Sequence, residues 1–211
     1  VKSAVKSGGS ALIRKPELAA RSIQSAKSAG LPVSVKTRLG YTKLDEWRDW
    51  LTHLLQQDIV NLTIHLRTKK EMSKVPAHHE LIPNILQLRD EVSPKTFITV
   101  NGDIEDRQQG MQIIEDNPGL NGIMIGRGVF HNPFCFETSQ TEHSKSELIG
   151  LLHIHLNLYD HYSQQTQRPY DTLKRFFKIY IREFDGAAEI RDKLMHSKST
   201  NEARLILNSV S

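Results

Sequence analysis

Four short apolar segments recur along the chain, and each is followed by a longer stretch with helical character. The segments are rich in β-branched side chains, which favour strands, and they occupy residues 31–40, 58–68, 95–104 and 120–130. Strands that alternate with helices in this way are typical of parallel βα units. The pattern therefore predicts an α/β fold with a parallel sheet.

The stretch from Leu44 to Gln57 shows helical spacing most clearly. Its large apolar residues fall at i, i+3, i+4, i+7 and i+8, namely Trp47, Trp50, Leu51, Leu54 and Leu55. This spacing produces one apolar face on a helix. We therefore expect both tryptophans to belong to the core.

Each predicted strand turns polar at its C-terminal end. In chain order, the residues there are Lys36 and Arg38, His65 and Arg67, Asn101 and Asp103, and Arg127. Two residues spaced by two lie on the same face of a strand, and the C-terminal ends of parallel strands form the usual active face of α/β proteins. A single charge there could simply reach solvent, but the same feature on four strands predicts a ligand site at this edge.

Arg127 stands between Gly126 and Gly128, where the fourth segment ends. Glycine lets the backbone approach a ligand closely, and an arginine beside free backbone N–H groups suits a phosphate group. The segment therefore predicts a phosphate site.

The pattern changes after Asn132-Pro133. Residues 138–147 are polar and aperiodic, which is typical of a linker, and the chain beyond them is predicted to be helical throughout. Residues 173–184 predict one helix whose apolar face is formed by Leu173, Phe176, Phe177, Tyr180, Ile181 and Phe184. A basic stripe on this helix consists of Lys174, Lys178 and Arg182, beside Arg175. The stripe is either a solvated face or a contact for an RNA backbone.

Composition and charge refine this picture. The net charge is +4, but the first 75 residues hold 14 Lys and Arg against 6 Asp and Glu, whereas residues 76–140 hold 4 against 9. Such an uneven distribution is compatible with an anionic partner. The single cysteine excludes a disulfide framework. No run of about 18 apolar residues and no signal-peptide pattern occurs, so we expect a cytoplasmic protein without a membrane span.

His78 and His79 are adjacent histidines and raise the question of a metal site. Neighbouring residues on a helix point about 100° apart, and no set of cysteines or carboxylates completes the ligands that a metal needs. We therefore expect no metal.

Four motifs, PVSVKTR, TIHLRT, VNGDI and GIMIGRGVFHNP, occur in an order and spacing that resemble the tRNA-dihydrouridine synthase family. The resemblance extends from Val1 to about residue 195. It implies an FMN-dependent (β/α)8 TIM barrel followed by a small all-helical domain. The four strands would be strands 5 to 8, so the expected fold is a partial barrel. Residues 1–140 would form the C-terminal half of the barrel, and residues 141–211 a helical tRNA-binding domain.

The resemblance also implies a role for each polar strand end. FMN would be held by Lys36, His65, Asn101, Gly102, Asp103, Gly126 and Arg127. Lys36 would lie beside the pyrimidine edge of the flavin, where a positive charge stabilises the reduced form. Substrate would be bound by Arg38, Lys174, Lys178 and Arg182, while Arg67 would brace the site.

The implied reaction is the reduction of uridine to 5,6-dihydrouridine in tRNA, an oxidoreductase activity. Hydride would pass from reduced FMN to C6 of the base, a cysteine thiol would protonate C5, and NADPH would serve as the reductant. The target base has to leave its stack to reach the flavin. Which uridine is modified is left open.

The catalytic cysteine of this family belongs to an Asn-x-Gly-Cys-Pro motif, which would stand just before Val1. Cys135 follows the fourth strand, and we expect it to be a buried structural thiol. No catalytic residue is therefore expected in this chain. The chain alone is expected to be inactive, to hold FMN poorly and to associate through the open edges of a half barrel.

Two other functions remain compatible with these residues. Another FMN-dependent TIM-barrel oxidoreductase acting on a small molecule would share the phosphate loops, and a noncatalytic RNA-binding remnant would keep the helical domain. Residues 69–82 also depart from the family pattern after the HLRT motif, which leaves the substrate loop open.

Overall fold

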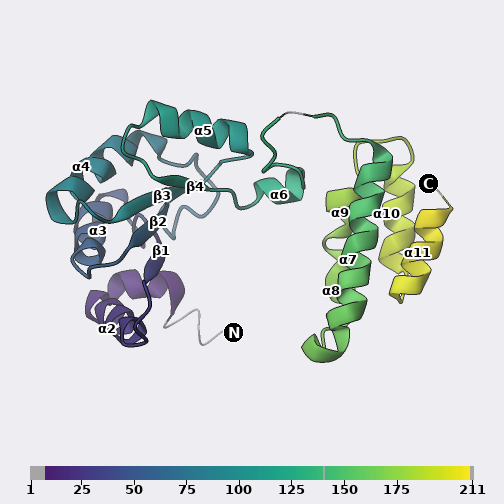
Figure 1. The fold of residues 1–211 in the computed structure, drawn as a ribbon, viewed down its shortest axis with the longest axis horizontal. Coiled ribbons are helices and arrows are strands. Elements are labelled where there is room, and N and C mark those ends of the chain that lie inside the picture. The colour runs from purple at the N-terminus through teal and green to yellow at the C-terminus, as the bar shows by residue number, and fades with distance from the viewer. Residues whose placement is uncertain (1–7, 140, 210–211) are drawn as a thin grey trace. The chain divides into compact units, whose positions relative to one another are not determined.

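The computed structural model of the chain describes residues 8–139 and 141–209, and it divides into two compact units (Figure 1). The first unit ends at Gly126 and the second begins at Arg127. The domain boundary expected from the sequence lies further along the chain, next to Gln140, which is outside the described residues.

The first unit is built on a parallel sheet with the strand order β1-β2-β3-β4. The strands are β1 (Ser34–Arg38), β2 (Asn61–His65), β3 (Phe97–Asn101) and β4 (Gly122–Met124). Each neighbouring pair is parallel. The predicted α/β class with a parallel sheet is confirmed, and the closure of these strands into part of a barrel stays a prediction.

Helices connect and cover the strands. They are α2 (Pro16–Lys27), α3 (Trp47–Leu55), α4 (Ile82–Val92) and α5 (Arg107–Asp116), with the 3-10 turns η1 (Gly9–Arg14), η2 (Leu44–Glu46) and η3 (His79–Leu81). The helix predicted from Leu44 is confirmed, except that its first turn is η2.

One face of the sheet is apolar and packs against these helices. Leu62, Ile64 and Val100 are fully buried there, and the indole N–H of Trp50 in α3 donates to Thr37 Oγ1 of β1 at 2.8 Å. Alternate residues of a strand point to opposite sides, and most of the residues that point to the opposite face of this sheet are polar. On it, Thr99 Oγ1 donates to Asn61 Oδ1 at 2.9 Å. Because the helices cover the apolar face, a ligand site is expected on the polar face.

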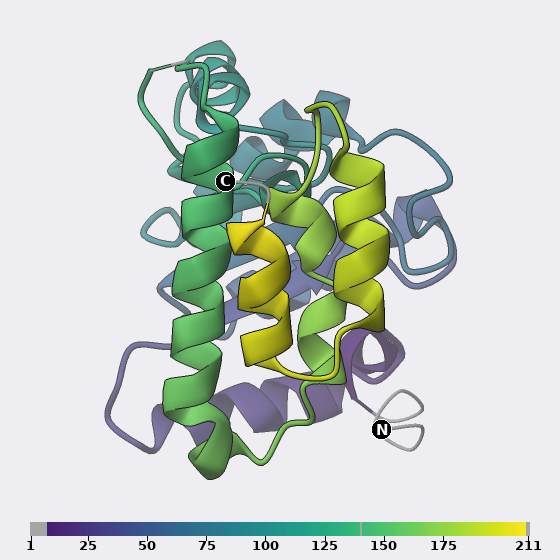
Figure 2. The same ribbon diagram turned by 90° about the vertical axis from the view of Figure 1, so that its right-hand side faces the viewer.

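The second unit is helical. It contains α6 (Gly128–His131), α7 (Lys145–Thr166), α8 (Asp171–Lys174), α9 (Phe177–Tyr180), α10 (Ala187–His196) and α11 (Thr200–Asn208). Ser144 caps α7 by a reciprocal arrangement with Glu147. Figure 2 shows α11 beside α7 and α10, in agreement with their contacts. The core of the second unit includes Leu152, Leu156, Phe177, Leu194 and Leu207.

The prediction of one helix over residues 173–184 is wrong. α8 ends at Lys174, α9 begins at Phe177 and ends at Tyr180, and Glu183 has a φ of +59°. The ring of Phe176, between the two helices, stacks on Phe130 with centroids 6.1 Å apart. Aromatic packing with the rest of this unit therefore overrides the helical periodicity.

The prediction that Cys135 is buried is confirmed, since its exposed fraction is 2%. Within the described ranges, no helix has both the length and the apolar character needed to cross a membrane.

Candidate functional site

The C-terminal ends of the first three strands meet in register. Arg38 of β1 pairs with His65 of β2, and His65 pairs with Asn101 of β3. On the polar face, Lys36 Nζ donates to Asn101 Oδ1 at 3.4 Å, and Asn101 Nδ2 donates to the carbonyl oxygen of Met124 at 2.7 Å. Asn101 thus links β1 to β4 across the edge where the sequence predicted a ligand site.

The two cations of β1 are partly withdrawn from solvent. Burial lowers the pKa of Lys36 from its ordinary value, and the charge of Arg38 lowers it further. Burial also lowers the pKa of Arg38, with a contribution from Arg67 that Glu71 opposes. Arg38 Nη1 donates to the carbonyl oxygen of Thr68 at 3.2 Å. These cations give the edge a positive potential that suits an anionic ligand.

His65 lies among the same cations, and burial together with these charges keeps its ring neutral. The pKa of His65 falls from 6.5 to about 4, first because burial disfavours the imidazolium and then because Arg38, Lys36 and Arg67 repel it. The carboxylate of Asp103 opposes this shift only in part. His65 therefore works as a neutral hydrogen-bonding group at neutral pH.

Gly102 follows β3 and lets the backbone turn tightly beside His65. Its φ is +125°, and a Cβ at this position would lie 2.9 Å from Ala77 Cβ and 3.0 Å from His65 Cδ2. The carbonyl oxygen of Gly102 lies 2.8 Å from His79 Nε2. Because a glycine is needed for both the conformation and the space, position 102 cannot carry a side chain without displacing its neighbours.

Gly126 and Arg127 lie where the chain passes from the first unit to the second. A Cβ at Gly126 would make only an ordinary contact, 3.6 Å from Asn101 Nδ2. Arg127 is the N-cap residue of α6. The glycine side of the predicted phosphate site thus lies next to Asn101 in the first unit.

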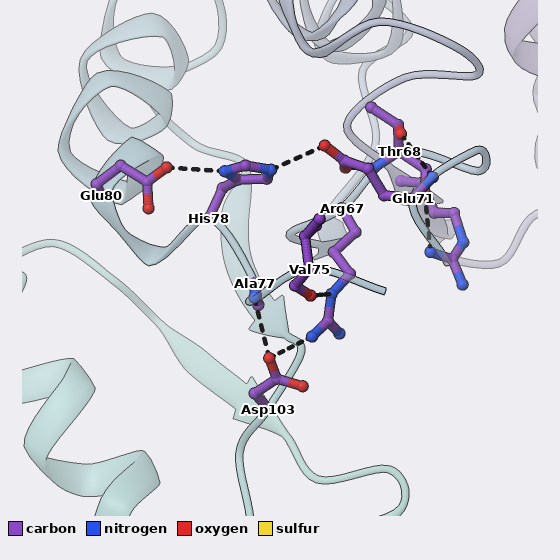
Figure 3. A network of polar contacts seen from close by, with 9 residues as sticks. Arg67, Thr68, Glu71, Val75, Ala77, His78, Glu80 and Asp103 are labelled. Atoms are coloured by element: carbon purple, nitrogen blue, oxygen red, sulfur yellow. Dashed lines mark hydrogen bonds and ion pairs between the residues drawn. The ribbon is translucent and has the colours of Figure 1, made fainter. Parts of the chain in front are cut away.

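Arg67, which follows β2, and Asp103, which follows β3, form an ion pair (Figure 3). The side chain of Arg67 is 3% exposed, and its Nε donates to the carbonyl oxygen of Val75 at 2.6 Å. Asp103 Oδ2 also accepts the backbone N–H of Ala77 at 2.9 Å. The carboxylate predicted to contact a cofactor is therefore engaged with the protein, and Arg67 braces the loop that follows β2.

The same loop contains a second network that the sequence did not predict. Figure 3 shows His78 between two carboxylates, with Nε2 at 3.0 Å from Glu71 Oε1 and Nδ1 at 2.8 Å from Glu80 Oε1. Glu71 Oε2 also accepts the backbone N–H of Thr68 at 2.7 Å. Burial alone would lower the pKa of His78, but the two carboxylates outweigh it and raise the pKa. No local pattern could reveal this network, because it depends on how the loop folds back.

The predicted RNA-binding residues of the second unit do not form one continuous helical stripe. Lys174 pairs with Asp171 at 2.8 Å, whereas Lys178 is exposed on α9. Arg182 lies beyond α9, donates to the carbonyl oxygen of His131 and pairs with Glu183.

Across the described ranges, no group of three or more His, Cys, Asp or Glu residues is arranged to hold a metal ion. His78 and His79, which the sequence raised as candidates, bond instead to carboxylates and to a carbonyl.

Comparison with known proteins assigns the chain to a family. The sequence model described as "Dihydrouridine synthase (Dus)" matches residues 2–210. "Probable tRNA-dihydrouridine synthase 2" of Bacillus subtilis is 61% identical over 200 residues, which cover 95% of this chain and 61% of that protein.

Two further relatives are each called "Probable tRNA-dihydrouridine synthase". The protein of Staphylococcus epidermidis is 57% identical over 98% of this chain and 63% of its own length. That of Staphylococcus aureus is 55% identical over 97% of this chain and 62% of its own length. The chain thus spans about three fifths of the length of these relatives. It belongs to the tRNA-dihydrouridine synthase family.

Proposed function

We propose that the protein containing this chain is an oxidoreductase that reduces uridine to 5,6-dihydrouridine in tRNA, with FMN as cofactor and NADPH as reductant. The observation that carries this proposal is the alignment of Arg38, His65 and Asn101 at one edge of a parallel sheet, with Lys36 bonded to Asn101. Membership of the family supports the substrate, since the relatives are named "Probable tRNA-dihydrouridine synthase" or "Probable tRNA-dihydrouridine synthase 2".

The residues at this edge fit the chemistry of a flavin mononucleotide. Lys36 offers a cation and Asn101 offers an amide, while Gly102, with its φ of +125°, allows the tight turn of the backbone that follows β3. FMN would be held by these groups together with His65, Gly126 and Arg127. The carboxylate of Asp103 already binds Arg67 and the backbone N–H of Ala77. Asp103 would therefore support the FMN site through its backbone and through this ion pair. When bound, reduced FMN would supply the hydride that adds to C6 of the uracil ring.

The remaining roles are those that the family resemblance implies, and position and charge support them. Arg38 would bind the target nucleotide from β1, where Thr68 O orients its guanidinium. His65 would donate or accept a hydrogen bond without changing its charge, because its pKa is lowered to about 4. We therefore do not assign His65 as the acid that protonates C5 of uracil.

The architecture proposed for the protein is a (β/α)8 barrel in which β1 to β4 are strands 5 to 8. Barrel enzymes place their active sites at the C-terminal ends of the strands, which is where Arg38, His65 and Asn101 lie. Residues 1–140 would form barrel and residues 141–211 a helical domain that contacts tRNA through Lys174, Lys178 and Arg182.

A flavin titration of the complete gene product and its variants tests the cofactor site. Arg127→Ala and Lys36→Met should each weaken FMN binding by about 1.5 to 3 kcal/mol, the usual contribution of a hydrogen bond to a charged group. Lys95→Met is the matched control, since Lys95 is exposed and precedes β3 at the opposite end of the sheet. Equal FMN affinity in all four proteins would contradict the proposed site.

A further inference from the structure

One edge of the His65 ring lies close to other residues of the protein. This edge, formed by Cδ2 and Nε2, lies against Gly102, where a Cβ would stand 3.0 Å from Cδ2 and 3.4 Å from Nε2. Nε2 is also 3.5 Å from Arg67 Nη1. The Nε2 edge of His65 therefore faces the protein.

Arg67 is fixed where it meets His65. Its side chain is almost fully buried, its Nε donates to the carbonyl oxygen of Val75, and its guanidinium pairs with Asp103 (Figure 3). Asp103 is itself fixed by the backbone N–H of Ala77. Arg67 thus approaches Nε2 from a position that the loop after β2 and the turn after β3 define together.

The chemistry of the two side chains decides where the proton of the imidazole lies. A guanidinium has N–H donors and no acceptor, so the ring nitrogen that faces it has to accept. A neutral imidazole carries one proton, and it must then be on Nδ1. The neutral state agrees with the surroundings of His65, because burial first and the nearby charges of Arg38, Lys36 and Arg67 second lower its pKa to about 4.

We propose that Arg67, anchored by Asp103, is a positioning residue that fixes His65 as the neutral Nδ1–H tautomer and so makes it a hydrogen-bond donor to the bound ligand. The group it meets would be an acceptor, either a carbonyl oxygen or an unprotonated ring nitrogen. Among the described residues, the hydrogen bond of the His65 ring is made through Nε2. The identity of the ligand rests on the proposed function, whereas the tautomer does not.

Nitrogen NMR of the 211-residue chain labelled with 15N-histidine tests the tautomer directly, without flavin or tRNA. His65→Gln assigns the His65 signals among those of the ten histidines. At pH 7 we expect Nδ1 protonated and Nε2 unprotonated, with His65 still neutral at pH 5. An Nε2-protonated ring or an imidazolium at pH 7 would overturn the proposal.

Two matched variants separate the hydrogen bond of Arg67 from its charge. Arg67→Met should raise the pKa of His65 and shift the ring toward the Nε2–H tautomer. Arg38→Met removes a positive charge that also lowers the pKa of His65, so it should raise the pKa and leave the Nδ1–H tautomer unchanged. The same tautomer in both variants would show that Arg67 does not set it.

Asp103→Asn covers the case in which Arg67→Met fails to fold, because it keeps the shape of the side chain and weakens only the anchor. It should move the tautomer in the same direction as Arg67→Met, by a smaller amount, and an unmoved tautomer would count against the anchor. Failure of the complete gene product to bind FMN would contradict the proposed function alone, since the NMR measurement requires no ligand.

Discussion

Two histidines near β2 show how strongly surroundings decide the behaviour of one residue type. Burial, and after it the charges of Arg38, Lys36 and Arg67, lower the pKa of His65. His78 lies between Glu71 and Glu80, whose effect outweighs burial and raises its pKa. Neither state could be predicted from the sequence, because the charges come from different strands and from a loop without periodicity. The strand-end positions of Lys36, His65 and Asn101 could be predicted, since they require only alternation along parallel strands.

The network around His78 predicts a pH-dependent contribution to stability. A raised pKa in the folded state means that this contribution is fully present below about pH 6.5, the ordinary value, and is lost as the pH rises through the folded pKa. His78→Gln should therefore lower the free energy of unfolding by about 1 kcal/mol at pH 6 and by less at pH 9, in urea titrations.

Glu71 and Glu80, the partners of His78, supply the control for the urea titrations. Glu71 has a side chain 22% exposed and Glu80 one that is 67% exposed. Exposed ion pairs contribute little, so Glu71→Gln should destabilise more than Glu80→Gln. An effect of His78→Gln that grows with rising pH would contradict the assignment.

Among the helices and strands, the regular segments could be predicted well from the sequence, and the segments that depend on distant contacts could not. The strands and α3 follow from alternation and from the spacing of Trp50, Leu51, Leu54 and Leu55, all of which are buried. The break between α8 and α9 could not be predicted, because Phe176 stacks on Phe130, a residue far away in the chain. Loop 66–78 likewise depends on the pairing of Arg67 with Asp103 from another strand end.

Gly102 provides a test of the turn after β3. Its φ of +125° and the atoms 2.9 and 3.0 Å from an added Cβ predict that Gly102→Ala destabilises the protein by about 1 to 3 kcal/mol. Gly150→Ala in α7 is the control, because no atom lies within 4 Å of its added Cβ, and alanine there should stabilise by up to about 1 kcal/mol. Urea unfolding that finds the two substitutions alike would refute this description of the turn.

At the scale of the whole molecule, two separate hydrophobic cores stabilise the two units. Both tryptophans, Trp47 and Trp50, belong to the first unit, so their fluorescence reports on that unit, whereas circular dichroism reports on both. Buried Leu62 lies in the first core and buried Leu152 in the second.

Leu62→Ala should lower the stability measured by tryptophan fluorescence by about 2 to 5 kcal/mol. Leu152→Ala should leave the fluorescence transition in place and shift part of the transition seen by circular dichroism. If Leu152→Ala moved the fluorescence midpoint as much as Leu62→Ala, the cores would not act separately.

The basic residues of the second unit allow a prediction of how tRNA affinity depends on salt concentration. Lys178 is exposed, while Lys174 and Arg182 already form ion pairs with Asp171 and Glu183. Lys178→Met should therefore reduce the slope of log affinity against log salt by roughly 0.7 to 0.9, the amount expected for one lost phosphate contact. Lys174→Met is the comparison and should change the slope less. An unchanged slope for Lys178→Met would indicate that this face is only solvated.

Conversion of uridine in tRNA to dihydrouridine with FMN, proposed for the protein that contains this chain, is best tested by mass spectrometry of an unmodified tRNA transcript after incubation with the complete gene product, FMN and NADPH. We expect a uridine that gains two hydrogens when protein, flavin and reductant are all present, and much less product with Lys36→Met than with Lys95→Met. A tRNA that keeps all its uridines, although the protein holds flavin and binds the transcript, would refute the proposed function.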